Sequence, residues 1–352
     1  MIRLSALIVA HGGVEKHTSV LAYLNQQQAR AHLARVGFLA QCVVRILLST
    51  TGTLATPNHI KRNRHMTIAR PNGTLKKLVD VGKQDTRVIG SVERWLLSQP
   101  KDTSRATDVI HPSAMVKKDW CHRAEYYTLQ GAEPAPSKYA VSMKQLLVFE
   151  EGHRIHARWQ KWFQNMGKLY GQWKCLECGL IEWGVSAEME PHIDGCGPVV
   201  YDEVPVHSSV HGIAGHADGW LKEFGDDLLL EIKSVGEGTI RWEDPQFLRE
   251  HDNDFKKAWA ALKQPFPVHI GQAQVYMKLL ELMDPENYPK EAVFIYESKV
   301  DQQVKEFVVP KSDFGITPLF EAAERIMTAI DKQQPPMCNI NPQGTCSKCE
   351  VF

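Results

Sequence analysis

The sequence predicts an α/β (α+β) fold, with a mixed central sheet flanked by helices. The chain has 352 residues, of which 43% are hydrophobic, so it can bury a sizeable core. From about residue 108, helix-like periodic segments alternate with short apolar runs typical of strands. Their order of helix, strands, helix and strands favours helices packed on a mixed sheet over an all-helical or all-strand fold.

The helix predictions rest on start signals and on apolar periodicity. Helix is expected over residues 15–49, irregular backbone over 50–88, and a short helix near Ser91–Ser98. His111-Pro112-Ser113 marks the next start, with Ser113 as N-cap, and that helix would continue through Cys121 to Tyr127. Three further helices are expected at Val148–Met166, His269–Met283 and Pro318–Lys332.

Four runs read as strands, and one cysteine-rich stretch does not. Glycine, cysteine and histidine interrupt residues 173–200, where no strand is expected. The strand-like runs are His211–Leu221, Leu228–Ser234, Ala292–Ser298 and Val304–Val309.

Charge divides the chain, although its formal net charge is zero. Residues 1–105 hold 16 lysines and arginines against 5 acidic residues, a net +11, so the rest carries −11. We therefore expect a basic N-terminal extension of uncertain fold over residues 1–107, followed by the main domain at 108–352. The extension suits contact with phosphates, or is a solvated basic surface.

No segment reads as a membrane span or an export signal. The sequence lacks a run of about 18 apolar residues, and Met1–Ala10 is too short and poorly flanked for a signal peptide. We expect a soluble, cytoplasmic protein with no membrane partner. In that compartment, the eight cysteines favour metal sites over disulfides.

The central pattern is Asp218 followed by Glu231-Ile232-Lys233. Glu231 and Lys233 interrupt an apolar strand, and the two-residue period puts both on one face. Asp218 and Glu231 can hold a divalent cation, with the Ile232 carbonyl as a further oxygen ligand. Such a cation activates water against a phosphodiester, while Lys233 orients the water and stabilises developing charge. The tripeptide alone would equally suit an ion pair at a strand edge.

Two flanking pairs complete an ordered set. Gly152…His156 lies upstream, with His156 expected at the start of a helix, and Gln272…Tyr276 lies downstream, four residues apart on one helix face. With Gly215…Asp218 and Glu231…Lys233, the set resembles the RecB-like branch of the PD-(D/E)xK nucleases. The resemblance implies a restriction-endonuclease-like core with metal at His156, Asp218 and Glu231. It also implies catalysis by Lys233, and DNA contact or site organisation by Gln272 and Tyr276.

A second resemblance involves the cysteines at the end of the chain. Cys121 begins C-x-R-x-x-Y-Y, and the C-terminal cysteines form C-x7-C-x2-C. These resemble the Cas-four-type CRISPR-associated exonucleases and their phage relatives, which implies a structural 4Fe–4S cluster. The long gap comes first here, which departs from the family spacing, so zinc stays an alternative, as do unligated cysteines. The implied ligands are Cys121, Cys338, Cys346 and Cys349.

A further cysteine group predicts an inserted zinc module at residues 173–200. Its pattern, C-x2-C-x13-H-x3-C, is close to zinc-finger spacing. The module would contact DNA or stabilise a loop. Its expected ligands are Cys175, Cys178, His192 and Cys196.

The expected function is that of a Mg²⁺- or Mn²⁺-dependent DNA exonuclease acting on single strands or DNA ends. Recombination, replication or repair would be its setting, in the host cytoplasm for a phage-encoded member. One alternative is an end-processing endonuclease with a partner, as in CRISPR spacer processing. Others are a non-catalytic DNA-binding protein of the same fold and an independent N-terminal DNA-binding module. Cleavage polarity, oligomeric state and partner recombination or replication proteins stay open.

Overall fold

The computed structural model describes residues 87–100, 105–135, 141–185 and 196–352. The helix predicted over 15–49, most of the irregular backbone predicted over 50–88 and most of the predicted basic extension lie outside these ranges, and so does His192. None of the helices in the described ranges combines the length and the apolar character that crossing a bilayer requires.

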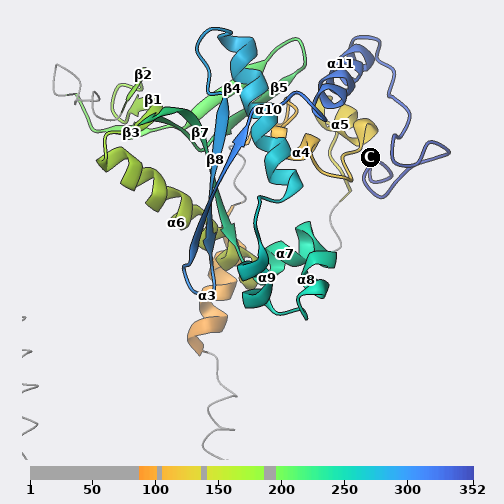
Figure 1. Cartoon of the computed structure of the whole chain (residues 1–352). Helices are drawn as coiled ribbons and strands as arrows, with labels where there is room; N and C mark the ends of the chain where they lie inside the picture. Colours follow the sequence, from red (N-terminus) through yellow and green to blue (C-terminus); the bar gives the residue numbers. More distant parts are fainter. Residues whose placement is uncertain (1–86, 101–104, 136–140, 186–195) are drawn as a thin grey trace, which may run out of the picture. The chain divides into compact units, whose positions relative to one another are not determined.

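A seven-stranded mixed sheet forms the centre of the fold (Figure 1). Its order is β2-β1-β6-β7-β8-β9, with β3 also paired to β1. Only β7 and β8 pair in parallel, and the other neighbours are antiparallel, which confirms the predicted mixed sheet. The strands are β1 (Leu169–Cys175), β2 (Ile181–Val185), β3 (Val199–Tyr201), β6 (Gly219–Phe224), β7 (Asp226–Val235), β8 (Glu291–Ser298) and β9 (Val304–Pro310). A separate two-stranded sheet contains β4 (Val204–Ser208) and β5 (Ile213–Ala217).

Helices cover both faces of this sheet, because successive side chains of β7 and β8 point to opposite sides. On one side, Leu230 and Ile232 pack with Ile155 and Phe163 of helix α6 (Met143–Asn165). On the other side, Leu229 and Val235 share the larger core with helix α10 (Pro267–Met283). Glu231 and Lys233 have the same parity as Leu229, so β7 directs them toward the α10 side.

The remaining helices surround this core. Helix α11 packs against α5, near the C-terminus (Figure 1). The helices are α3 (Arg87–Ser98), α4 (Pro112–Met115), α5 (His122–Leu129), α7 (Glu237–Glu243), α8 (Pro245–Glu250), α9 (Phe255–Ala261) and α11 (Thr317–Asp331).

The helix predicted from Ser113 through Tyr127 is two helices. Pro112 takes the first helical position of α4 and His111 is its N-cap, so Ser113 lies inside the helix. A turn follows, and Cys121 becomes the N-cap of α5, where its sulfur accepts from the Ala124 amide at 3.4 Å. The break matters because it places the cysteine at a helix end instead of within a helix.

Two strand predictions also need correction. Residues 173–200 contain strand residues of β1, β2 and β3, although glycine and cysteine hid the alternation of buried and exposed positions. The run predicted over His211–Leu221 divides at Asp218 into β5 and β6, which belong to different sheets. Helices α7, α8 and α9 were not predicted.

Candidate functional site

Asp218 lies where the chain leaves the small sheet for the large one, between β5 and β6. Its Oδ2 accepts a hydrogen bond from the Ile232 amide of β7 at 2.6 Å. Its Oδ1 is 3.2 Å from Nδ1 of His156. His156 lies in the middle of α6 rather than at a helix start, so the long helix carries it across to the carboxylate.

Glu231 and Lys233 meet on the α10 side of β7. Glu231 is completely buried, and its carboxylate forms an ion pair with the Lys233 ammonium. Neither Glu231 oxygen receives a hydrogen bond of ordinary geometry from any residue that the structure describes. A buried carboxylate without donors is costly, so this one is suited to a further positively charged partner.

Helix α10 brings the other predicted pair to the same place. Nζ of Lys233 donates to Oε1 of Gln272 at 3.4 Å, and Nε2 of Gln272 donates to the Tyr276 hydroxyl at 3.0 Å. Gln272 and Tyr276 therefore share a helix face, as the spacing predicted. The structure thus gathers all six predicted side chains around β7.

The pKa shifts record how closely these charges lie. Burial, and then the Asp218 carboxylate, raise the pKa of Glu231 to about 7 despite the opposing ammonium of Lys233. Burial also acts to raise the pKa of Asp218, but His156 and Lys233 outweigh it and hold that pKa below its ordinary value. Burial acts to lower the pKa of Lys233, but the Glu231 and Asp218 carboxylates raise it.

The donor set fits a hard divalent cation. The set comprises two carboxylates, the Ile232 carbonyl and an imidazole, and apart from the ion pair with Lys233 the Glu231 carboxylate receives no hydrogen bond in the described part of the chain. Adjacent ligands of an octahedral ion with bonds of about 2.1 Å lie about 3 Å apart. The 3.2 Å between His156 Nδ1 and Asp218 Oδ1 matches that separation.

Two residues beside Asp218 were missed from the sequence. Nε2 of Gln160 donates to the Asp218 carbonyl at 2.9 Å and lies 3.3 Å from Oε1 of Glu203. Gln160 follows His156 by four residues on α6, so helix periodicity could have found it. Glu203 lies between β3 and β4, and no spacing rule connects it to Asp218.

A buried pair behind Lys233 was also missed. Tyr296 of β8 is the register partner of Lys233, and its hydroxyl contacts Nδ1 of His269. The Phe266 amide donates to that hydroxyl at 3.0 Å. Burial, and then Lys233, lower the pKa of His269 to about 3, so its ring is neutral near pH 7. The pair fixes the first turn of α10 against β8, next to Lys233.

The four end cysteines converge into one group. The sulfurs of Cys121, Cys338, Cys346 and Cys349 all lie within 4.8 Å of one another. Backbone amides donate to three of them, at 3.4 Å for Cys121, 3.2 Å for Cys338 and 3.3 Å for Cys349. Burial acts to raise the pKa of Cys338, but the Asn341 and Ile340 amides outweigh it and bring that pKa to about 6. The amides thus favour the thiolate, the form that binds metal, at Cys338, whereas burial raises the pKa of Cys121 to about 12 and also raises that of Cys349.

The sulfur separations test which metal group fits. Cys121 and Cys338 are 3.8 Å apart, as are Cys346 and Cys349. Four thiolates around one tetrahedral zinc, with bonds of about 2.3 Å, lie about 3.8 Å apart. In a 4Fe–4S cubane each thiolate binds a different iron, which separates the sulfurs further. These distances suit a single ion, and the iron–sulfur cluster stays a prediction.

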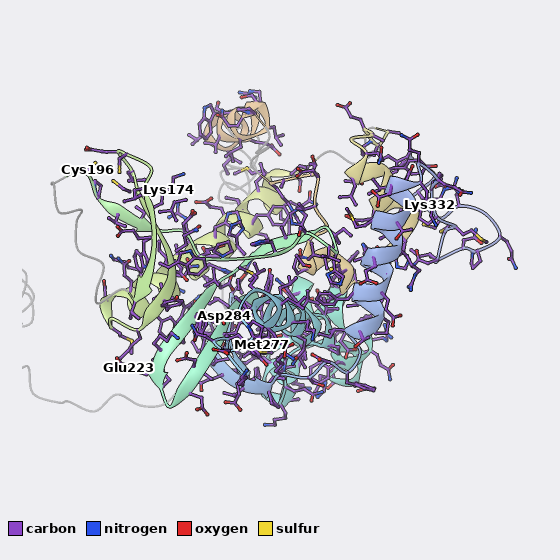
Figure 2. All side chains as sticks on the ribbon, turned by 90° about the horizontal axis from the view of Figure 1, so that it is seen from above. Lys174, Cys196, Glu223, Met277, Asp284 and Lys332 are labelled. Atoms are coloured by element: carbon purple, nitrogen blue, oxygen red, sulfur yellow. The ribbon has the colours of Figure 1, made fainter. Side chains whose placement is uncertain are left out.

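A second cysteine group lies apart from these four cysteines in space. Cys175, Cys178 and Cys196 have sulfurs within 4.8 Å of one another. Figure 2 shows Cys196 on the opposite side from Lys332, which precedes the C-terminal cysteines. Three thiolates can contribute to a metal site, and the predicted fourth ligand, His192, lies outside the described residues.

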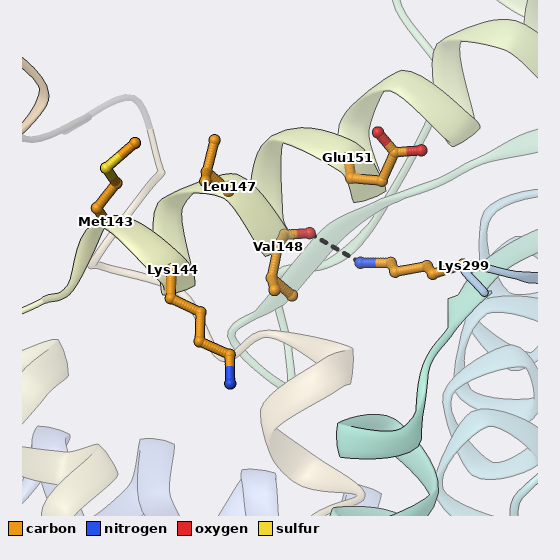
Figure 3. Close-up of a pocket in the computed structure, with 6 residues that line it drawn as sticks. All are labelled: Met143, Lys144, Leu147, Val148, Glu151 and Lys299. Atoms are coloured by element: carbon orange, nitrogen blue, oxygen red, sulfur yellow. Dashed lines mark hydrogen bonds between the residues drawn. The ribbon is translucent and has the colours of Figure 1, made fainter. Parts of the chain in front are cut away.

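A surface pocket along the first half of α6 shares no residue with these sites. Nζ of Lys299 donates there to the Val148 carbonyl at 2.8 Å (Figure 3). The lining carries one carboxylate and two ammonium groups on an otherwise apolar surface. The lining residues are Met143, Lys144, Leu147, Val148, Glu151 and Lys299.

No family model and no curated protein match the sequence. Among solved structures, an alkaline exonuclease from Laribacter hongkongensis, LHK-Exo, is similar at a TM-score of 0.35 and 13% identity, over 64% of this chain and 90% of that one. Its complex with dAMP gives the same values. The structure of SSO0001 has a TM-score of 0.30 and 13% identity, over 67% and 81% of the two chains. Likeness at this level establishes no shared activity, so function must be inferred from the site.

Proposed function

We propose that the protein is a metal-dependent DNA nuclease of the PD-(D/E)xK type, with its catalytic centre at Asp218, Glu231 and Lys233. One observation carries the proposal. Glu231 is fully buried, its carboxylate is met by the Lys233 ammonium alone among the donors of the described residues, and it lies under the electrostatic influence of Asp218. A structural ion pair would not need two carboxylates competing for one ammonium, whereas a cation site does.

In this proposal, Asp218, Glu231, His156 and the Ile232 carbonyl would hold Mg²⁺ or Mn²⁺. When bound, the cation supplies an activated water and neutralises charge on the scissile phosphate. The Ile232 amide keeps Asp218 oriented by occupying Oδ2, which leaves Oδ1 toward His156.

Lys233 would orient the reacting water and stabilise the developing negative charge. Gln272 accepts from its ammonium and is itself hydrogen-bonded to Tyr276. This series of hydrogen bonds holds the Lys233 Nζ beside the carboxylates, where it can donate a proton or stabilise an oxyanion. Gln272 would also contact the DNA backbone, or organise the site together with Tyr276, whose side chain is buried.

We assign the substrate as DNA, single-stranded or with free ends, and the reaction as exonucleolytic, on the sequence motifs. The setting would be recombination, replication or repair. A partner-dependent endonuclease would use the same residues, so a covalently closed circle distinguishes the two, because only an endonuclease cleaves it. A non-catalytic DNA-binding protein has no use for the buried Glu231–Lys233 arrangement.

The four-cysteine group would be a structural metal site that joins α5 to the C-terminal segment. Its sulfur separations favour zinc, and the motif resemblance implies a 4Fe–4S cluster. The Cys175, Cys178 and Cys196 group, with His192, would hold zinc in a module inserted between α6 and Asp218.

The test is degradation of end-labelled single-stranded DNA in Mn²⁺ by the full-length protein and by Lys233→Ala. We expect metal-dependent degradation that falls by about a hundredfold or more in the variant. Lys174→Ala, a change at an exposed lysine of β1, is the matched control and should retain activity. Equal activity in Lys233→Ala and wild type would contradict the assignment.

A further inference from the structure

Glu203 lies in a backbone position that the fold defines closely. Its carbonyl accepts from the Gln172 amide of β1 at 2.8 Å, and the preceding Asp202 amide donates to the Gln172 carbonyl at 2.8 Å. The connection between β3 and β4 is therefore paired to β1 on both sides of Glu203. These hydrogen bonds fix the position of the backbone from which the Glu203 side chain extends.

Backbone strain accompanies this placement. Glu203 has φ of 60°, in the left-handed region that residues other than glycine seldom occupy. Opposite it is Gly171, where a Cβ would come within 2.7 Å of the Glu203 carbonyl oxygen and of the Tyr201 hydroxyl. Non-glycine residues in this conformation are retained where the surrounding structure over-determines them. The chain combines a strained glutamate with a glycine opposite it.

The Glu203 side chain is linked to Asp218 through one residue of α6, Gln160. A single amide nitrogen, Nε2 of Gln160, lies 3.3 Å from Oε1 of Glu203 and 2.9 Å from the Asp218 carbonyl. His156 is one turn earlier on α6 and contacts Oδ1 of Asp218 at 3.2 Å. Burial, and then the Asp218 carboxylate, raise the pKa of Glu203.

Acidic groups outnumber the lysine and arginine partners around Asp218, which favours binding of a cation. Glu203, Asp218 and Glu231 are three acidic groups, and Lys233 is the only lysine or arginine that forms an ion pair with any of them in the described ranges. The Glu231 oxygens are buried and, apart from this ion pair with Lys233, receive no hydrogen bond there. His156 also lies against Asp218, and a divalent cation, whose preferred partners are oxygen ligands, offsets the negative charge that remains.

We propose that Glu203 is a further acidic ligand of the cation held at Asp218, and that Gln160 positions it. This inference rests on the proposed metal-dependent function and deepens it. It adds to the site a carboxylate from the β3–β4 connection, which no motif indicated.

The experiment is a calorimetric titration of metal-free, full-length protein with Mn²⁺, supported by the Mn²⁺ electron paramagnetic resonance spectrum. Glu203→Gln removes the charge but keeps an oxygen that accepts from Gln160. If Glu203 had only a structural role, the variant protein would therefore bind Mn²⁺ with the affinity of wild type. We expect at least about tenfold weaker binding. Asp202→Asn, one residue away and exposed, is the matched control and should bind like wild type.

Asp218→Asn separates this proposal from the proposed function. If Asp218→Asn loses Mn²⁺ and Glu203→Gln does not, Glu203 is not a ligand, and the metal site stands without it. If wild type binds no Mn²⁺, both proposals fail. Weaker binding in Glu203→Gln, with unfolding midpoints equal to wild type in metal-free buffer, supports the proposal.

Discussion

The carboxylate site and the four-cysteine group are held in place in opposite ways. Glu231 and His156 project from a strand and a helix, Asp218 lies directly between β5 and β6, and backbone or side-chain hydrogen bonds fix its carboxylate. Three of the four cysteines lie in residues 332–352, which contain no helix or strand. The first site is prearranged by the core, whereas in our proposal a bound metal would help to hold the segment that carries the second.

Contacts between protein groups supplement the cysteines but are few. Asn339 accepts from the His122 amide at 2.8 Å and donates to the Trp120 carbonyl at 3.0 Å. Lys348 pairs with Asp119 at 2.9 Å on the surface, where an ion pair contributes little. Removing metal from the cysteine group should therefore affect stability, and removing it from the carboxylate site should affect activity.

The largest effect that this difference predicts is on stability. Cys349→Ser removes one ligand of the four-cysteine group, and we expect the free energy of unfolding to fall by about 3 kcal/mol or more, because binding of a structural metal contributes directly to folding. Chemical denaturation with metal analysis measures it. The exposed Ser347→Ala is the control. Unchanged stability after complete loss of metal would contradict a structural role.

A smaller effect should follow from pH at the carboxylate site. The pKa of Glu231 is raised to about 7, so below that pH a proton occupies the carboxylate and competes with the cation. Apparent Mn²⁺ affinity should fall by up to about tenfold per pH unit as pH drops from 7 to 5. Titrations at several pH values check this. A flat profile would show that Glu231 does not bind the ion.

The smallest effect concerns the support behind Lys233. Tyr276→Phe removes the hydroxyl that accepts from Gln272, a contact of about 1 kcal/mol, so we expect a loss of roughly fivefold in turnover. Separate kcat and KM values on single-stranded DNA distinguish positioning from binding. A change confined to KM would favour direct DNA contact by Tyr276 instead.

Much of this arrangement was predictable from the sequence, because the period of a strand fixes which side chains share a face. Glu231 and Lys233 were placed together on that basis, and Gln272 and Tyr276 by the period of a helix. The mixed sheet and its parallel β7–β8 pair required a helical crossover, which α10 provides. These features depend on local patterns that survive in any tertiary context.

Other features could not be predicted, because they arise from contacts distant in sequence. Glu203 reaches Asp218 through Gln160 of another element, and its placement depends on a strained backbone opposite Gly171. The strands that include parts of residues 173–200 were missed because glycine and cysteine interrupt the apolar pattern there, and β2 does not alternate between buried and exposed positions. Sulfur separations at the cysteine group likewise exist only in three dimensions, so the sequence left zinc and an iron–sulfur cluster open.

The most direct test of the central claim is the anomalous scattering of manganese in crystals of the full-length protein soaked in Mn²⁺. The account predicts a peak between Asp218 Oδ1 and Glu231, within about 2–2.5 Å of their oxygens. That peak should be absent from crystals of Asp218→Asn. No peak at this position in the wild-type protein, or a peak that persists in Asp218→Asn, would contradict the assignment of this site as a catalytic metal centre.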